Sequence, residues 1–320
     1  MKFSIRVLVL VAACLRFQGA FAADSPTRIW IDTDAACGAG LLKDVDDCLA
    51  IAMLLENPKW DVVGISTVFG NAAITATDRI VRRLVEARCG NCVPVYRGAK
   101  QPGNESTHAV EALVAALETG PLVVFVFGPA TNVSAALQSS NAVIEGHRFV
   151  AVAGTRERRT RFRISRYSPF RLRDLNFASD PGAFEFLLSK ATNLSLVPFE
   201  LAQQVRFRAR HIDKLADHFP RLARQSRRWL WIWRLLFGSN QFHPFDAVAL
   251  GLLFPDQSGL ICSPGRAAVV DYSPLARKPR PILHVLLDST EPNVSYCHEI
   301  AIDYVDTLLE RLPNLSKQAN

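Results

Sequence analysis

Short apolar runs rich in β-branched and aromatic residues alternate along this chain with segments of helical periodicity. The expected strands are 28–31, 62–68, 93–96, 122–127, 148–153 and 194–201. The expected helices are 45–56, 72–88, 107–118, 181–190, 210–218 and 245–252. Strands joined through helical crossovers pair in parallel, and the helices cover both faces of the sheet. The alternation therefore predicts an α/β fold with a mainly parallel, open sheet.

Two further strand-like runs, 259–272 and 282–287, are expected to extend the sheet at one edge. The 320 residues, 49% of them hydrophobic, can form one large domain with a covered core. No internal repeat or low-complexity linker divides the chain. We expect a single domain over residues 23–320.

Residues 1–22 have the pattern of a secretory signal peptide, with basic residues before an apolar run and small residues after it. The run, 7–15, is too short to span a bilayer and ends at Arg16. We expect an exported protein, periplasmic or secreted, without stable membrane insertion. A lipoprotein acylated at Cys14 is the alternative.

The net charge argues against a nucleic-acid partner. It is formally +7, and +4 without residues 1–22. Nucleic-acid binding calls for a concentrated basic stripe, whereas the densest basic stretch here, 156–173, runs directly into the segment Asp-Leu-Asn at 174–176. The oligomeric state stays open, and a homo-oligomer is compatible with this composition.

Carboxylates gather where the first expected strand ends and the next helix begins. Asp32 and Asp34 end the strand, and Asp44, Asp46 and Asp47 open the helix. Acidic residues favour a helix N-terminus, but that does not explain the pair on the strand. Like charges repel unless a cation holds them, and oxygen ligands without Cys or His clusters suit calcium or magnesium. The sequence therefore predicts a metal site beyond the carboxyl ends of the strands.

This arrangement resembles the inosine/uridine-preferring nucleoside hydrolase family, in which a strand ends in Asp-x-Asp and a paired Asp-Asp opens the next helix. Four further segments resemble the family's pattern in the expected order: 63–71, 127–132, 174–181 and 242–249. The resemblance implies a Rossmann-like core. It also implies a hydrolase that cleaves the N-glycosidic bond of ribonucleosides to give ribose and free base.

The resemblance assigns roles to individual residues. It implies one calcium ion bound by the carboxylates of Asp34, Asp47 and Asp246 and the main-chain oxygen of Phe127. Asp34 would also act as the base that deprotonates the attacking water. The ribose hydroxyls would be held by Asp46, Asn71, Asp174 and Asn176, with Asp32 supporting the loop from behind. Anionic surroundings and a metal-activated water suit an oxocarbenium-like transition state.

Three features depart from the family's pattern. The loop 35–45 between the second and third aspartates carries eight extra residues. Asp174 stands where many members have Glu. Phe245 occupies the position of the His that protonates the leaving base in purine-preferring members, and we place the nearest imidazole, His243, with the substrate-binding residues.

The cysteines suit an oxidising compartment, because six remain after removal of residues 1–22. Cys37 lies inside the extended loop and Cys48 directly follows Asp47, so we expect a disulfide that limits the freedom of the loop. Cys89 and Cys92 have no second Cys-x-x-Cys or His cluster to complete a zinc site, which favours a small structural disulfide.

The segment 229–233 contains three tryptophans and allows three interpretations: core packing, a platform for the nucleobase, or contact with a membrane surface. Tyr167 and Phe242 are further candidates for the base pocket. Two other functions stay open. One is an exported nucleoside- or ribose-binding protein without turnover. The other is a phosphatase of the haloacid dehalogenase type, although the residues 35–37 after the second aspartate do not fit that family.

Overall fold

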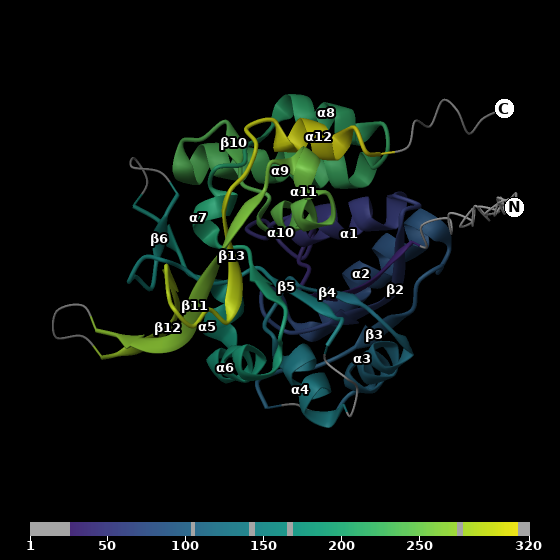
Figure 1. Ribbon diagram of the computed structural model, residues 1–320. Helices are drawn as coiled ribbons and strands as arrows, with labels where there is room; N and C mark the ends of the chain where they lie inside the picture. Colours follow the sequence, from purple (N-terminus) through teal and green to yellow (C-terminus); the bar gives the residue numbers. More distant parts are fainter. Residues whose placement is uncertain (1–25, 104–105, 141–144, 165–168, 274–277, 313–320) are drawn as a thin grey trace, which may run out of the picture.

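The computed structural model describes residues 26–103, 106–140, 145–164, 169–273 and 278–312. A nine-stranded sheet runs through its centre in the order β12-β11-β13-β8-β5-β4-β1-β2-β3 (Figure 1). Its strands are β1 Thr27–Thr33, β2 Trp60–Thr67, β3 Val95–Arg97, β4 Val123–Val126, β5 Arg148–Ala151, β8 Leu194–Leu196, β11 Ile261–Tyr272, β12 Arg280–Leu287 and β13 Val294–Glu299.

The sheet is parallel from β13 to β3, and β11 pairs antiparallel with both β12 and β13. The expected mainly parallel sheet, with strands added at one edge, is therefore confirmed. Strand β13, which joins the antiparallel edge to β8, was not expected from the sequence. Two short ribbons complete the strands, β6 Phe162–Arg163 with β7 Arg171–Leu172, and β9 Phe207–Arg208 with β10 Gln241–Phe242.

Helices cover both faces of the sheet (Figure 1). The longer ones are α1 Asp46–Glu56, α2 Ile74–Cys89, α3 His108–Thr119, α4 Thr131–Ser139, α6 Pro181–Lys190, α8 Ala209–Ala216 and α9 Pro220–Phe237. The shorter ones are α5 Leu175–Ser179, α7 Phe199–Ala202, α10 Phe245–Ala249, α11 Pro255–Ser258 and α12 Tyr304–Leu309, with a 3₁₀ turn at Leu250–Leu253.

Alternate residues of β1 separate the two cores. Ile29 and Ile31 lie in a cluster with α1, α8, α9 and α10, whereas Trp30 lies in a second cluster with α3, α4 and α6. This follows from the period of two in a strand, whose successive side chains point to opposite faces of the sheet. Since both faces are covered, the middle of β1, residues 29–31, is apolar, and Asp32 and Thr33 follow at its carboxyl end.

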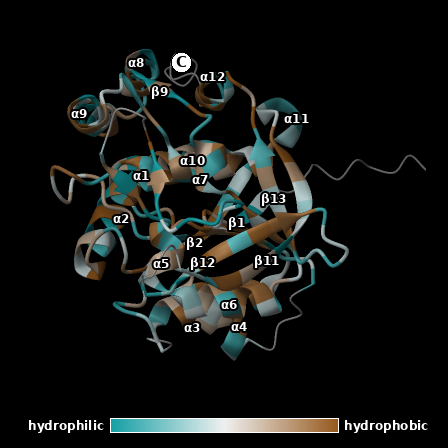
Figure 2. Cartoon of the chain, turned by 90° about the vertical axis from the view of Figure 1, so that its left-hand side faces the viewer, coloured by the Kyte–Doolittle hydropathy of each residue, from teal (hydrophilic) through white to brown (hydrophobic). Residues whose placement is uncertain are grey.

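The longest helix, α9, was not expected from the sequence. Its buried residues, among them Leu222, Ser226, Leu230, Trp233 and Phe237, recur at spacings of three and four. Arginines fill much of the remaining surface, and Figure 2 shows hydrophilic and hydrophobic residues together on this helix. The arginines hide the apolar stripe when the sequence is scanned for long apolar segments.

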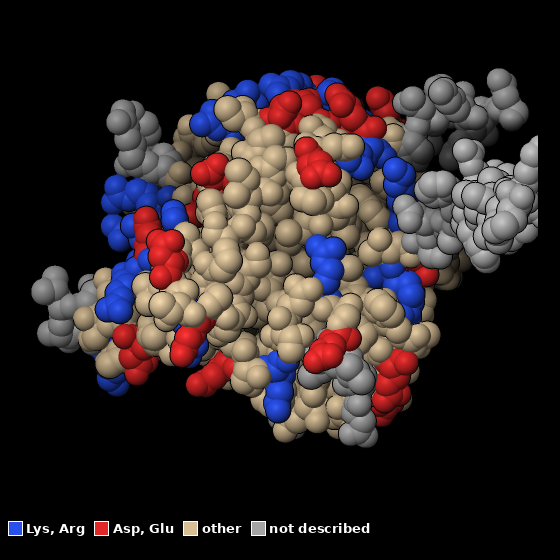
Figure 3. All heavy atoms as spheres, in the orientation of Figure 1, with Lys and Arg blue, Asp and Glu red and all other residues tan. Residues whose placement is uncertain are grey.

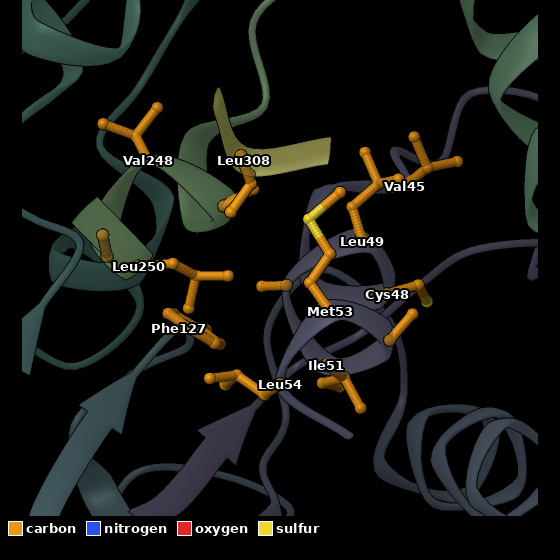
Figure 4. Close-up of a cluster of buried hydrophobic side chains, with 14 of the residues drawn as sticks. Val45, Cys48, Leu49, Ile51, Met53, Leu54, Phe127, Val248, Leu250 and Leu308 are labelled. Atoms are coloured by element: carbon orange, nitrogen blue, oxygen red, sulfur yellow. The ribbon is translucent and has the colours of Figure 1, made fainter. Parts of the chain in front are cut away.

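Two helices that begin at the carboxyl edge of the sheet share one core. Leu54 of α1, Phe127 after β4 and Val248 of α10 belong to the same buried cluster (Figure 4). This packing fixes the first turns of α1 and α10, which carry acidic residues, above the ends of β1 and β4. No helix in the described ranges is long and apolar enough to cross a membrane.

Candidate functional site

A cavity of about 430 Å³ lies at the carboxyl ends of the central parallel strands. Eight residues expected to bind metal or ribose line it: Asp34, Asp46, Asp47, Asn71, Phe127, Asp174, Asn176 and Asp246. They come from segments up to 212 residues apart in the sequence. The sheet therefore brings the acidic strand end and the two acidic helix starts to one place.

The aspartates around the end of β1 are closely spaced, and Asp34, Asp46, Asp47 and Asp246 are buried, whereas Asp44 is half-buried. One oxygen each from Asp44, Asp46 and Asp47 can be chosen so that all three lie within 4.8 Å of one another. Asp34 accepts a hydrogen bond from the backbone amide of Asn71 at 2.7 Å, and Asp47 accepts one from the Thr33 hydroxyl. Asp44 was part of the acidic group in the sequence but had been given no role.

The surroundings of these carboxylates favour their protonated forms unless positive charge is supplied. Burial, and next the charge of Asp47, raise the pKa of Asp34 and of Asp246 well above the usual range. Burial and the nearby Asp44 raise the pKa of Asp47 to about 7. Asp46 has a buried oxygen, Oδ1, without a hydrogen-bond partner in the described structure. The donor set fits a hard divalent cation that binds oxygen.

Asp32 lies behind the cavity, where it was expected to support the loop. Its Oδ1 accepts hydrogen bonds from the Ser66 hydroxyl at 2.5 Å and from Asn132 Nδ2 at 2.8 Å. Burial raises its pKa to about 7. Asn132 also donates to the carbonyl of Thr67 at 3.1 Å, so this network ties the end of β1 to the end of β2.

Asp174 and Asn176 also line the cavity, and hydrogen bonds with the backbone hold both. Asp174 caps α5, with its carboxylate accepting from the amides of Gly154 at 2.8 Å and Phe177 at 3.1 Å. Burial raises its pKa to about 6. Asn176 Nδ2 donates to the carbonyl oxygens of Phe127 at 2.9 Å and Val152 at 3.0 Å. A carbonyl oxygen has two lone pairs, so that of Phe127 keeps one for a cation.

The extended loop 35–45 reaches into the same cavity. Lys43 donates to the carbonyl oxygen of Asn71, and Asp44 accepts from the side-chain amide of Asn71 at 2.6 Å. Gly38, with φ +84°, lies so close to α9 that an added Cβ would come within 2.7 Å of Gln225 Nε2. The loop is therefore held near Gly38 at one end and by Lys43 and Asp44 at the other. The expected disulfide Cys37–Cys48 is confirmed.

The other two cysteine pairs also form disulfides. Cys89–Cys92 closes the short turn that was expected to be structural. Cys262–Cys297 joins directly paired residues of β11 and β13. All six cysteines of the described residues are therefore oxidised.

Aromatic side chains form another part of the cavity wall. Trp229 and Trp233 stand one helical turn apart on α9 and both line the cavity, whereas Trp231 points outward and is 56% exposed. Phe199 and Phe245 line it too and stack at 5.2 Å between ring centroids. Trp233 is buried in the core and also borders the cavity. Its place is therefore compatible with two of the three interpretations of this segment, core packing and a platform for the nucleobase.

Two residues expected on the substrate side do not line the cavity. His243 does not line the cavity; it is buried, with Nδ1 2.7 Å from the carbonyl oxygen of Val205 and its ring 5.1 Å from that of Trp233. Burial lowers its pKa. Phe242 is fully buried against Phe207, away from the cavity lining. Tyr167 and residues 1–22 lie outside the described residues.

Two arginines of the lining, Arg171 and Arg173, were missed as site residues. They belong to the dense basic stretch 156–173, which was considered only as a whole. Their position directly before the segment 174–176 could have indicated that they lie near the site. No histidine occurs among the residues that line the cavity.

Comparisons with known proteins agree with this geometry. Residues 29–273 match the family model described as inosine-uridine preferring nucleoside hydrolase. A probable uridine nucleosidase 2 of Arabidopsis thaliana is 27% identical over 235 residues, covering 61% of this chain and 66% of that protein. A uridine nucleosidase of Saccharomyces cerevisiae is 35% identical over only 85 residues, 26% of this chain and 23% of that protein.

Solved structures share the fold. A purine-preferring ribonucleoside hydrolase from Gardnerella vaginalis superposes with a TM-score of 0.73 at 16% identity, covering 92% of this chain and all of that chain. A plant nucleoside hydrolase gives 0.70 at 18% identity, covering 90% and 99% of the two chains. The family match covers most of the sequence and includes the acidic cavity. The chain therefore belongs to the inosine-uridine preferring nucleoside hydrolase family, whose members are hydrolases acting on N-glycosyl compounds.

Proposed function

We propose that this protein is a calcium-dependent nucleoside N-ribohydrolase in which Asp34 acts as the base. The observation that carries the proposal is the meeting of buried aspartates, the Phe127 carbonyl and an aromatic wall around one cavity. Family membership supports hydrolysis of ribonucleosides at the N-glycosidic bond. The identity of the ion and the role of Asp34 are the parts that we add.

The ion would be held by Asp34, Asp47, Asp246 and the main-chain oxygen of Phe127. Bound there, it would offset the charge of the carboxylates and make a nearby water easier to deprotonate. Calcium suits this set because it accepts many oxygen ligands in irregular geometry, whereas magnesium demands a strict octahedron and keeps most of its waters.

The chain's own groups can then carry out the reaction. Asp34 accepts a proton from the water that attacks C1′ of the ribose. The surrounding carboxylates stabilise the positive charge that develops on the sugar as the bond to the base breaks. Asn71, Asp174 and Asn176 hold the ribose hydroxyls, and the base lies against the aromatic wall of Trp229 and Phe199.

The described cavity lining contains no imidazole that could protonate the leaving base. Phe245 occupies the expected position of that group, and His243 is turned into the core. We propose that water or another group protonates the leaving base, and that the rate depends mainly on stabilisation of the sugar cation and on activation of water.

We further propose that the protein acts after export, in the periplasm or outside the cell. Three disulfides support this, because such bonds persist in oxidising compartments. Cell fractionation and the N-terminal sequence of the exported protein would test the proposal. A cytoplasmic protein that retains residues 1–22 would refute it.

The central test is to incubate the purified protein with a panel of purine and pyrimidine ribonucleosides and calcium, and to measure reducing sugar. We expect sugar and free base in equal amounts, with loss of activity on chelation and recovery with calcium. Tight nucleoside binding without base release would instead indicate a binding protein.

A further inference from the structure

A second cavity, of about 270 Å³, adjoins the first. The two share Arg173 and Asp174, so the second lies beside the residues that we assign to the ribose hydroxyls. Its other polar lining includes Arg159, Thr160 and Arg280. Its apolar lining includes Phe162, Phe177 and Leu283, all of them buried.

Few carboxylates of the described residues lie near the guanidinium groups around this second cavity. Arg159 forms an ion pair with Glu157. No carboxylate in the described parts of the chain lies within 4.0 Å of the charged groups of Arg173 or Arg280. The nearest acid in the lining, Asp174, already accepts two backbone amides. The second cavity is therefore a site of net positive charge next to a strongly acidic one.

The three arginines are exposed, and they come from two distant parts of the chain. Arg159 and Arg173 flank the β6–β7 ribbon, whereas Arg280 begins β12, more than a hundred residues later. Basic side chains gather over the β6 region on the left of Figure 3. A basic stretch of sequence could be solvated anywhere, but here a remote strand adds its arginine to the same cavity.

Guanidinium groups in such a cluster match the oxygens of a phosphate. Arginine presents a planar fork of donors that binds phosphate through paired, charge-assisted hydrogen bonds. On a ribose, the 5′ oxygen is carried by an exocyclic carbon and can extend furthest from the ring. A phosphate there could reach the arginines while the ring stays near the aspartates, which would repel a phosphate on a hydroxyl beside them.

We propose that this second cavity binds the phosphate of a nucleoside 5′-monophosphate, and that the protein hydrolyses nucleotides as well as nucleosides. The inference rests on the proposed hydrolase function. The C1′–N bond breaks, the oxygen of water bonds to C1′, and the water's proton ends on the base nitrogen. The products are ribose 5-phosphate and free base.

The test compares uridine with its 5′-monophosphate, and inosine with its 5′-monophosphate, in the presence of calcium, with free base as the readout. We expect kcat/KM for the nucleotides to equal or exceed that for the nucleosides. In Arg280→Ala, the ratio of nucleotide to nucleoside kcat/KM should fall at least tenfold, mainly through KM. Arg280→Lys should restore part of it, since the charge is kept without the fork.

Arg266→Ala is the matched control, because Arg266 is an exposed arginine of β11 that pairs with Glu291 and lines neither cavity. It should leave the ratio unchanged. Nucleoside turnover without nucleotide turnover would overturn the inference and leave the hydrolase intact, as would a ratio insensitive to Arg280.

Calorimetric titration with uridine and its 5′-monophosphate separates binding from catalysis. Tighter binding of the monophosphate, lost in Arg280→Ala, would support the phosphate site even if neither compound were hydrolysed. In that case the hydrolase proposal would fail, together with the nucleotide hydrolysis that rests on it, and the binding site would stand. Equal binding of the two compounds would refute the site.

Discussion

The side-chain amide of Asn71 lies 2.6 Å from both carboxylate oxygens of Asp44. The first residue is one that we expect to hold a ribose hydroxyl, and the second belongs to the extended loop. Asp44 also lies beside Asp46 and Asp47, near enough to share a cation with them. The loop thus contributes to the site instead of bulging away from it.

Asp44 should therefore influence both metal and ribose binding. In Asp44→Ala, we expect calcium affinity to fall by about 10–100-fold, as for other residues that orient metal ligands. KM for nucleosides should rise because Asn71 loses its partner. Calcium titration by calorimetry and steady-state kinetics would check both. Asp256→Ala, on the exposed helix α11, is the control. Unchanged calcium affinity in Asp44→Ala would contradict this role.

Asp34 should be indispensable. Asp34→Asn keeps the size of the side chain but removes the charge that accepts the proton, and we expect kcat to fall by at least about 10²–10⁴-fold. Calcium binding should weaken as well. Release of reducing sugar and calcium titration are the measurements, with Asp256→Asn as control. Full activity of Asp34→Asn would exclude Asp34 as the base.

Stability of the metal-free protein should depend on pH. Asp32 and Asp47 titrate near 7 in the folded chain and near 3.8 when unfolded. Between these values the folded state binds more protons, so its stability should fall as pH rises from about 4 to 7. Calcium should reverse the loss, because it favours the ionised carboxylates.

Thermal unfolding at pH 5 and pH 7.5, with chelator or with calcium, would measure this effect. We expect a lower Tm at pH 7.5 in chelator, and a larger rise on adding calcium at pH 7.5 than at pH 5. Asp47→Asn should reduce both differences. A Tm that rises with pH in chelator would contradict the expected direction.

The leaving base should receive little protonation from His243. Its imidazole is buried against Trp233 and contacts the Val205 carbonyl. We expect His243→Ala to slow inosine hydrolysis only modestly, and p-nitrophenyl riboside, whose leaving group needs no proton, to react much faster than inosine. A loss of several orders of magnitude on inosine alone would identify His243 as the acid.

The Cys37–Cys48 disulfide should stabilise the metal loop. Its two cysteines are 11 residues apart, so removing the bond should cost on the order of 2–3 kcal/mol in the free energy of unfolding. We expect Cys37→Ala/Cys48→Ala also to weaken calcium binding. Cys89→Ala/Cys92→Ala, which opens a much shorter loop, is the control and should leave calcium affinity intact. Equal calcium affinity in both double variants would show that the loop needs no bridge.

The sequence pattern predicted the central parallel strands, five of the seven longer helices and the acidic part of the site, but not β13, α4 or α9. These features are local, because strand and helix periodicity decide which residues are buried. An aspartate at the end of a parallel strand or the start of the next helix also has few directions in which to point. Eight of the site residues expected from the sequence accordingly line one cavity.

The aromatic and basic residues of the two cavities depend instead on how distant segments pack together. Trp229 and Trp233 reach the cavity because α9 packs over it, and Arg280 joins Arg173 because the edge of the sheet places β12 beside α5. The same reason explains why His243 does not line the cavity. The direction of a side chain in a loop depends on packing against distant segments, here Trp233 and Val205, and sequence spacing does not contain that information.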